Sequence, residues 1–305
     1  MAMIEIAVVG GGPAGLTAAL YAARAGRSVT VFEGNSFGGQ ITQSPLVENY
    51  PGLGNVSGME LGDRMYVQAE QAGATLSFSG VEAIQKSAAG TFLLTTEDGI
   101  VEAQAVIYAA GAAPKHLELP VEDALVGRGV SYCALCDGAF FANQDVAVAG
   151  GGNTALEDAL YLAQRCRSVT LIHRRNTFRA ESALVERAKA TGNLTIVTQA
   201  QITALLAQDG NLTGLLLQMQ DGTTKPLAVS GLFVAFGRVP DTAPLSGLAA
   251  RDEQGYVLTD DQMQTLTPGL FAAGDCRHKQ IRQLTTAVSD GTVAAISACR
   301  YLGNR

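Results

Sequence analysis

The stretch EIAVVGGGPAGLTAALYAARAGRSVTVFE, residues 5–33, is repeated at residues 145–173 as DVAVAGGGNTALEDALYLAQRCRSVTLIH. Because 14 of the 29 aligned positions are identical, the two copies are expected to fold alike. Each copy runs from an apolar segment through three glycines into a helical pattern and then into a second apolar segment. A strand, a glycine turn, a helix and a second strand form the nucleotide-binding unit of doubly wound folds. The repeat therefore predicts an α/β protein with two dinucleotide-binding domains.

The first copy has the residues that a dinucleotide site requires. Gly10 permits a tight turn, Gly12 lets a pyrophosphate approach the backbone, and Gly15 lets helix and strand pack closely. Glu33 ends the second strand, where its carboxylate is expected to accept hydrogen bonds from ribose hydroxyls. The predicted contacts of the turn are Gly10, Gly12, Pro13, Ala14 and Gly15.

Two later segments favour FAD over NAD in this first site. Residues 105–111 form an apolar run that ends in Ala110 and Gly111. Residues 269–275 form a second run that places Asp275 beside Gly274, as would suit a contact with the flavin ribityl chain or a phosphate. A helix expected over about 285–302 would direct its N-terminus towards the same site.

The second copy differs from the first at the positions that select the nucleotide. Ala155 replaces the third glycine, and His173 replaces the ribose-binding acid. Arg174, Arg175 and Arg179 follow, and guanidinium groups bind a 2′-phosphate through charge-assisted hydrogen bonds. The second site is therefore predicted to bind NADPH. The residues expected to contact it from the turn are Gly150, Gly152, Asn153, Thr154 and Ala155.

A Cys-x-x-Cys pair, Cys133 and Cys136, lies just before the second copy and is followed by Asp137. Zinc would need four ligands, and no second such pair or nearby histidine supplies them. The interpretation favoured over zinc ligation and over an inert pair is a redox disulfide. Asp137 is a candidate acid or base, or else a carboxylate favoured by a helix dipole. The other cysteines, expected to be structural, are Cys166, Cys276 and Cys299.

Gly/Pro-rich segments at 111–115 and 236–244 indicate where the chain leaves the first domain and returns to it. We expect an FAD-binding domain of residues 1–114 and 244–305, with an NADPH-binding domain of residues 115–243 inserted into it. The insert would carry both NADPH and the dithiol, so a hinge at the two crossings would let each reach the same flavin.

These motifs resemble those of the flavoprotein disulfide reductases, and most of all the bacterial low-molecular-weight thioredoxin reductases. The resemblance spans nearly the whole chain and includes VVGGGPAG, GGQITQSPLVENYPG, GRGVSYCALCDGAFF, HRRNTFRAE and LFAAGDCRHKQIRQLTTAVSDGTVAA. One departure is Ala110, where the family often has threonine. The further flavin contacts that the resemblance implies are Gly39, Gln40, Asn49, Arg282 and Gln283.

The resemblance also implies an activity, NADPH-dependent reduction of thioredoxin or a thioredoxin-like disulfide protein by a homodimer. In that family Cys136 would face the flavin, Cys133 would attack the partner disulfide, and Asp137 would manage the proton. Two alternatives stay open. The donor could be ferredoxin, with another ADP-containing molecule (even a second FAD) in the second site, or the protein could be a dithiol oxidase.

Bulk properties exclude several other classes of function. A net charge of −7 disfavours a nucleic-acid partner, whose phosphates require a basic surface. No apolar run reaches the roughly 18 residues of a membrane span. The N-terminal residues resemble no secretory signal, and five cysteines are too few for a disulfide scaffold, so a cytoplasmic location is expected.

Overall fold

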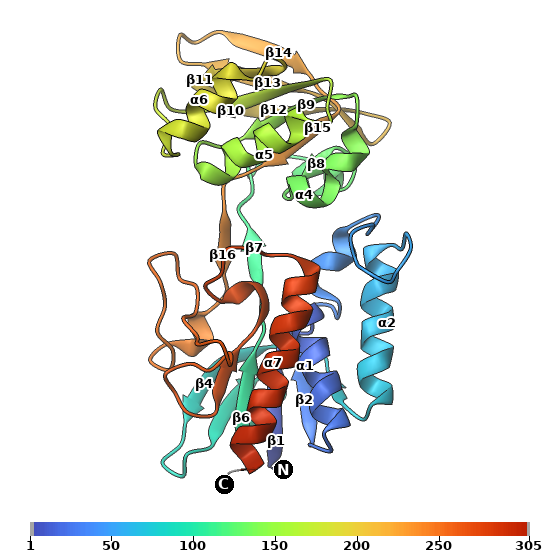
Figure 1. Cartoon of the computed structure of the whole chain (residues 1–305), viewed down its shortest axis with the longest axis vertical. Coiled ribbons are helices and arrows are strands. Elements are labelled where there is room, and N and C mark those ends of the chain that lie inside the picture. Colours follow the sequence, from blue (N-terminus) through green and yellow to red (C-terminus); the bar gives the residue numbers. More distant parts are fainter. Residues whose placement is uncertain (1–2, 304–305) are drawn as a thin grey trace. The chain divides into compact units, whose positions relative to one another are not determined.

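The computed structural model describes residues 3–303, and the chain divides into two compact units (Figure 1). The first unit extends to Ala113 and resumes at Val239, and the second unit is Pro114–Arg238. Each unit contains one copy of the repeat and its own sheet with parallel central strands. The α/β class with two Rossmann-like domains, predicted from the repeat, is confirmed.

The chain returns to the first unit at Val239, earlier than the expected residue 244, because the residues after it bind to that unit. The hydroxyl of Tyr108 donates to the carbonyl of Asp241 at 2.8 Å. The hydroxyl of Thr242 donates to the carbonyl of Gly255 at 2.9 Å. These polar contacts carry no signal in the local sequence, which shows only the Gly/Pro-rich character of the crossing.

The outgoing and returning crossings pair with each other. β7 (Ala112–Pro114) and β16 (Arg238–Pro240) form a separate two-stranded sheet (Figure 1). Just beyond β7, the amide of Lys115 donates to the carbonyl of Gly237 at 3.0 Å. The two ends of the inserted unit are therefore held side by side.

The first unit is built on a seven-stranded sheet in the order β3-β2-β1-β6-β5-β4, with β17 also paired to β6. Its parallel core is β1 with its neighbours, and β4 and β5 extend it in antiparallel pairing. Ile6, Ala7 and Val8 are fully buried, which explains the continuous apolar run of this strand. The strands are β1 (Ile4–Val9), β2 (Val29–Phe32), β3 (Thr75–Ser77), β4 (Val81–Lys86), β5 (Phe92–Thr96), β6 (Gly99–Tyr108) and β17 (Leu270–Ala272).

Two helices of this unit, α1 and α7, pack closely because small residues meet between them. Ala18 and Ala22 of α1 lie in the same buried cluster as Ala294 and Ala298 of α7. The helix expected over about 285–302 is thereby confirmed. The helical segments are α1 (Pro13–Arg24), η1 (Gly39–Gln43), α2 (Gly58–Gln71), η3 (Ala243–Leu245), η4 (Gly274–Cys276) and α7 (Leu284–Gly303).

The second unit has a five-stranded parallel sheet in the order β11-β10-β9-β15-β8 and an antiparallel sheet in the order β12-β13-β14. The parallel strands are β8 (Val130–Ser131), β9 (Asp145–Ala149), β10 (Ser168–His173), β11 (Leu194–Thr198) and β15 (Gly231–Val234). The antiparallel strands are β12 (Ala200–Gln208), β13 (Asn211–Met219) and β14 (Thr224–Ala228). The helices are α3 (Glu122–Leu125), α4 (Ala134–Asp137), η2 (Gly138–Phe141), α5 (Asn153–Ala163) and α6 (Ser182–Ala190).

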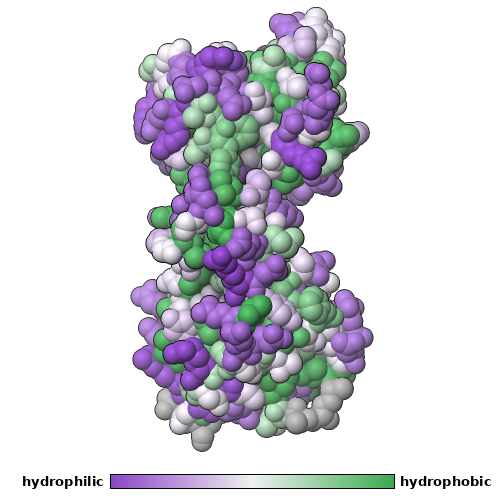
Figure 2. Space-filling view, turned by 90° about the vertical axis from the view of Figure 1, so that its right-hand side faces the viewer, coloured by the Kyte–Doolittle hydropathy of each residue, from purple (hydrophilic) through white to green (hydrophobic). Residues whose placement is uncertain are grey.

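Hydrophilic residues and smaller apolar areas are interspersed over both units on the face drawn in Figure 2. Within residues 3–303, no helix combines the length and the apolar character that crossing a membrane requires.

Asp158 on α5 makes the stability of the protein depend on pH. Burial, with a smaller effect of Glu157, raises the pKa of its carboxyl from 3.8 to about 7. Because the buried carboxyl is accommodated best when neutral, its contribution to stability is fully present below the pKa that it has in the unfolded chain. That contribution is lost as pH rises through the pKa that it has in the folded protein. We therefore expect Asp158→Asn to increase the free energy of unfolding by roughly 2–4 kcal/mol near pH 8 and by much less near pH 4. Urea unfolding at the two pH values measures this, with Glu253→Gln, at an exposed acid in a loop of the other unit, as the control. An equal effect at both values would contradict it.

Candidate functional site

The turn of the first site begins at the carboxyl end of β1, where close backbone contacts require glycine at positions 10 and 15. Gly10 has a φ of 104°, and a Cβ there would lie 2.5 Å from the carbonyl oxygen of Ala109. A Cβ on Gly15 would collide with the carbonyl oxygen of Gly10. At Gly12, by contrast, a Cβ would have room, because the Cα of Gly39 would lie 4.0 Å from it. Gly12 immediately precedes α1, and no side chain caps the helix there. The first turn of α1 can therefore direct its amide groups at an anion.

Glu33 ties the end of β2 to this turn. One carboxylate oxygen accepts from the amide of Gly11 at 2.7 Å, and the other accepts from the amide of Asn35 at 2.8 Å. Because a carboxylate has further acceptor positions, these bonds fix its orientation and leave capacity for hydroxyl donors.

The residues that the resemblance assigned to the flavin come together around the same turn. A Cβ on Gly39 would lie 3.1 Å from the Cα of Gly12. The Gln40 side chain donates to the carbonyl of Ala112 at 2.7 Å, next to Gly111. Gly111 has a φ of 73° and follows Ala110 at the carboxyl end of β6. The segments after β1 and β6 thus lie at one sheet edge, where ligands bind in open α/β sheets.

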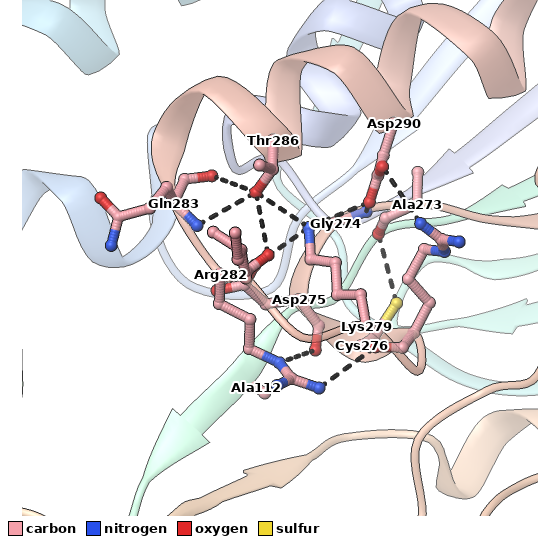
Figure 3. Close-up of polar contacts among 12 residues, drawn as sticks. Ala112, Ala273, Gly274, Asp275, Cys276, Lys279, Arg282, Gln283, Thr286 and Asp290 are labelled. Carbon is pink, nitrogen blue, oxygen red and sulfur yellow. Dashed lines mark hydrogen bonds and ion pairs between the residues drawn. The ribbon is translucent and has the colours of Figure 1, made fainter. Parts of the chain in front are cut away.

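The segment from Gly274 into α7 completes the first site (Figure 3). Gly274 has a φ of 77°, and a Cβ on it would lie 2.8 Å from the Cβ of Ala14 at the start of α1. The Oδ1 atom of Asp275 is buried, and among the described residues no donor hydrogen-bonds to it. The Nζ of Lys279 lies 3.5 Å from that oxygen, which is an ion-pair distance without hydrogen-bond geometry. A hydroxyl donor of a ligand would satisfy this oxygen.

Arg282 and Gln283 are positioned just before α7. The Arg282 guanidinium lies 3.9 Å from the centre of the Tyr256 ring, and its Nε donates to the carbonyl of Asp275 at 3.3 Å. The Oε1 of Gln283 accepts from the Asn49 side chain at 3.4 Å. Sequence reasoning did not identify Tyr256, because an isolated tyrosine in a loop carries no signal.

The turn of the second site lies between β9 and α5, as the first lies between β1 and α1. A Cβ on Gly150 would lie 2.7 Å from the carbonyl oxygen of Ala235 and 2.6 Å from the Cβ of Ala155. Gly152 has no other atom within 4 Å of a built Cβ and precedes α5 without a side-chain cap. Ala155 is fully buried against the strand, and Thr154 is exposed in the first turn of α5. This turn can therefore also receive an anion.

His173 is buried beneath the second turn. A Cβ on Gly151 would collide with its imidazole ring, which also stacks on Phe178 at 5.0 Å. Its Nε2 lies 3.0 Å from the carbonyl of Thr177, so this nitrogen carries the proton and donates. Burial and the neighbouring arginines lower the pKa of His173, which favours the neutral ring. The position that holds an acid in the first copy therefore supports the backbone here.

The segment after β10 carries three exposed arginines. Arg174, Arg175 and Arg179 are exposed, and within residues 3–303 none of them forms an ion pair. The amide of Arg179 donates to the carbonyl of Gly151 at 2.9 Å, which fixes the basic segment to the glycine turn. A basic segment is thus bonded to the residue that precedes Gly152.

A reciprocal pair of hydrogen bonds holds the same segment from its far end. The Asn153 side chain donates to the Glu181 carboxylate at 3.1 Å, and its carbonyl oxygen accepts from the Glu181 amide at 2.9 Å. Glu181, which sequence reasoning did not identify, neutralises no arginine here. Its role in the structure is to join α6 to α5.

The two cysteines of the Cys-x-x-Cys motif form the expected disulfide. Cys133 precedes the single turn of α4, and Cys136 lies within it, exposed. The amide of Cys136 lies 3.2 Å from the sulfur of Cys133. Among the described residues no other disulfide occurs, and Cys166, Cys276 and Cys299 are free thiols.

Asp137 ends α4 and is connected to the dithiol through Ser131. The Ser131 hydroxyl donates to the Asp137 carboxylate at 2.6 Å and accepts from the amide of Cys133 at 3.0 Å. Burial raises the pKa of Asp137, and the bond from Ser131 offsets part of that shift. The carboxyl group is thus suited to hold a proton close to the sulfur atoms. Sequence reasoning missed Ser131, since a serine in a short strand is not distinctive.

Comparison with known proteins agrees with this arrangement. The family model of the pyridine nucleotide-disulphide oxidoreductases matches residues 4–291. The bifunctional thioredoxin reductase/thioredoxin of Mycobacterium leprae is 44% identical over 98% of this chain, which spans 66% of that longer protein. The thioredoxin reductase of Mycolicibacterium smegmatis is 42% identical, with 99% of this chain and 97% of that protein covered.

A solved structure matches equally well along its length. The thioredoxin reductase of Streptococcus pyogenes superimposes with a TM-score of 0.95 at 39% identity, covering 100% of this chain and 99% of that one. The chain therefore belongs to the pyridine nucleotide-disulphide oxidoreductases and, among them, to the thioredoxin reductases.

Proposed function

We propose that this protein reduces the disulfide of thioredoxin, with FAD in the first site, NADPH in the second and Cys133–Cys136 as the redox disulfide. The observation that carries the proposal is the disulfide itself. It lies next to an acid of raised pKa, in the same unit as a glycine turn that is bonded to an arginine-rich segment. The names of the relatives support the choice of thioredoxin as the partner.

The first site fits FAD in its donors and acceptors. The N-terminus of α1 and the open face of Gly12 suit the pyrophosphate, and Glu33 has acceptor capacity for the ribose. The buried, unbonded oxygen of Asp275 suits a ribityl hydroxyl. Gln40, Asn49, Arg282 and Gln283 would then border the ring system, as the family resemblance implies.

The second site fits NADPH better than NADH. Arg174, Arg175 and Arg179 have no acidic partner among the described residues and would hold the 2′-phosphate. His173 supports Gly151 and cannot repel that phosphate as an acid would. A ferredoxin-dependent protein would not need this charge, so NADPH is the favoured donor.

The chemistry that bound FAD would supply is to accept hydride from NADPH and to pass an electron pair to the protein disulfide. Opening the disulfide leaves Cys133 and Cys136 as a dithiol. The Cys133 thiolate attacks the thioredoxin disulfide, forming a mixed disulfide and releasing one thioredoxin thiolate, which takes a proton from Asp137. Cys136 then attacks Cys133, which releases the second thiolate and restores the Cys133–Cys136 disulfide. Two electrons leave the dithiol and two enter thioredoxin.

The role of Asp137 predicts a specific pH dependence. Because burial raises its pKa, it can donate a proton at pH values where an ordinary aspartate has already lost it. We expect Asp137→Asn to lower kcat by roughly 100-fold and to remove the decline of kcat that accompanies ionisation of this acid as pH rises. Ser131→Ala, which removes the bond that stabilises the carboxylate, should move that decline to higher pH. Steady-state kinetics with thioredoxin over a pH series measures both, and an unchanged profile in both variants would contradict the role.

The experiment that tests the proposed function is an anaerobic titration of the purified protein with NADPH. We expect the yellow flavin absorbance to bleach, and subsequent addition of oxidised thioredoxin to restore it. Flavin that stays oxidised in excess NADPH would refute the donor. Flavin that bleaches but does not recover with thioredoxin would refute the partner.

Both the NADPH site and the dithiol belong to the inserted unit, between residues 114 and 238. We infer that this unit rotates about the two crossings so that each site meets the flavin in turn. The homodimer implied by the resemblance stays a prediction.

A further inference from the structure

One buried carboxylate, that of Asp290, interrupts the apolar helix α7. Asp290 is 6% exposed, and its Oδ2 accepts from the amide of Gly274 at 3.1 Å. The same oxygen lies 3.0 Å from the Nζ of Lys279, and Oδ1 lies 3.2 Å from a guanidinium nitrogen of Arg277 (Figure 3). A single side chain thus binds one amide and two cations of the segment before α7.

The residue after Asp290 fixes α7 to the first turn of α1. A Cβ on Gly291 would collide with the carbonyl oxygen of Ala14, so only glycine permits this approach. Gly274 meets Ala14 from the other side. The pair Asp290–Gly291 therefore joins the start of α1, which would receive the FAD pyrophosphate, to the segment that carries Asp275.

Lys279 extends this connection to Asp275. Its side chain is 9% exposed and lies between the carboxylates of Asp275, at 3.5 Å, and Asp290, at 3.0 Å. It also donates to the hydroxyl of Thr286 in the first turn of α7. Asp275 Oδ1 accepts no hydrogen bond from the described residues, and its contact with Lys279 is an ion pair at longer range.

We propose that Asp290 is a positioning residue for the flavin. It holds Gly274, Arg277 and Lys279 in the arrangement in which Asp275 and the N-terminus of α1 bind FAD together. The inference rests on FAD occupying the first site, as in the proposed function. Asp290 touches no atom of the ligand in this scheme and acts through its three partners.

Charge compensation distinguishes this role from simple packing. Removing one member of a buried ion pair leaves an uncompensated charge, whereas removing both members is often tolerated. Asp290→Asn keeps the size of the side chain and an acceptor for Gly274. It leaves Arg277 without its anion and Lys279 with the Asp275 carboxylate alone, so that two cations are matched by one carboxylate. Adding Lys279→Met removes one of these two cations, and Arg277 keeps its bond to the Thr259 hydroxyl.

The test measures the Kd of FAD for flavin-free protein, together with the visible circular dichroism of the bound flavin. We expect Asp290→Asn to raise the Kd at least tenfold and to change the dichroism, and Lys279→Met alone to raise it less than threefold. The double variant should recover at least threefold of the lost affinity. Glu5→Gln is the matched control, because it removes the part-buried ion pair with Arg27 at the opposite end of β1 and should leave the Kd unchanged.

An Asp290→Asn variant that binds FAD as tightly as the unaltered protein would overturn the inference. So would a double variant with no recovery, because the loss would then come from packing. If Asp290→Asn alone does not fold, recovery of folding and of FAD binding in the double variant supports the inference, and failure of both overturns it. An unaltered protein that binds no FAD would instead refute the proposed function.

Discussion

Serine in place of either Cys133 or Cys136 is expected to lower kcat/KM for thioredoxin by more than about 1,000-fold, as loss of an essential nucleophile does. Reduction of the flavin by NADPH should continue in both variants, because it precedes the dithiol. An anaerobic titration should therefore show each variant accepting one electron pair fewer than the unaltered protein. Cys299→Ser, which removes a thiol outside the disulfide, is the control and should retain full activity.

The two serine variants should also differ from each other. With Cys136 replaced, the Cys133 thiolate can still attack thioredoxin, but no second thiol releases the product. We expect this variant to accumulate a mixed disulfide, visible on a non-reducing gel, and the Cys133→Ser variant to accumulate much less. The opposite pattern would exchange the assigned roles, and full activity in both variants would refute the proposed chemistry.

Alanine at both Arg174 and Arg175 is expected to remove most of the preference for NADPH over NADH. Each charge-assisted hydrogen bond contributes about 1.5–3 kcal/mol, so losing two of them should reduce the ratio of kcat/KM values roughly 10²- to 10⁴-fold. The change should appear in KM for NADPH, with the constants for NADH nearly unaltered, because NADH has no 2′-phosphate.

Arg187→Ala is the matched control, since this arginine is exposed on α6 of the same unit and lies outside the basic segment. Equal kcat/KM values for the two coenzymes in the unaltered protein would contradict the assignment of the second site. A double variant with undiminished preference would shift the role to Arg179.

The fold could be predicted from the sequence because its determinants are local. Gly10 and Gly15 meet the backbone of neighbouring residues closely, and the repeat marks both turns. The Cys133–Cys136 disulfide was likewise predicted from the spacing of the pair and from the lack of further zinc ligands nearby. Apolar periodicity and residue spacing are short-range properties, so they can be read from a single sequence.

The supporting residues could not be predicted, because their contacts form only once the loops and helices are folded against one another. Asp290 binds Gly274, Arg277 and Lys279 only when α7 is in place, and Ser131 meets Asp137 across the turn of α4. A weak signal did exist for Asp290, which is the sole acid in the helical segment 284–303. A lone acid in an apolar helix indicates a buried partner, although the sequence does not say which.

For His173, the alignment of the two repeats predicted the position in the strand correctly but did not predict the orientation of the side chain. The alignment with Glu33 placed it at the end of the second strand, where it lies in β10. Alignment could not indicate that its ring would be buried under Gly151, because that depends on the stacking with Phe178. Its place among the NADPH contacts stays a prediction.

The pairing of β7 with β16 bears on how such a chain could arise and be re-engineered. The amide of Lys115 donates a hydrogen bond to the carbonyl of Gly237, so the inserted unit begins and ends at neighbouring points. The first unit, which is the host of the insert, is therefore interrupted at a single place. A short hairpin loop could close the host after excision of the insert, and the excised piece could equally be circularised. A duplicated module spliced in at one surface position would leave every strand of the recipient sheet in its original order.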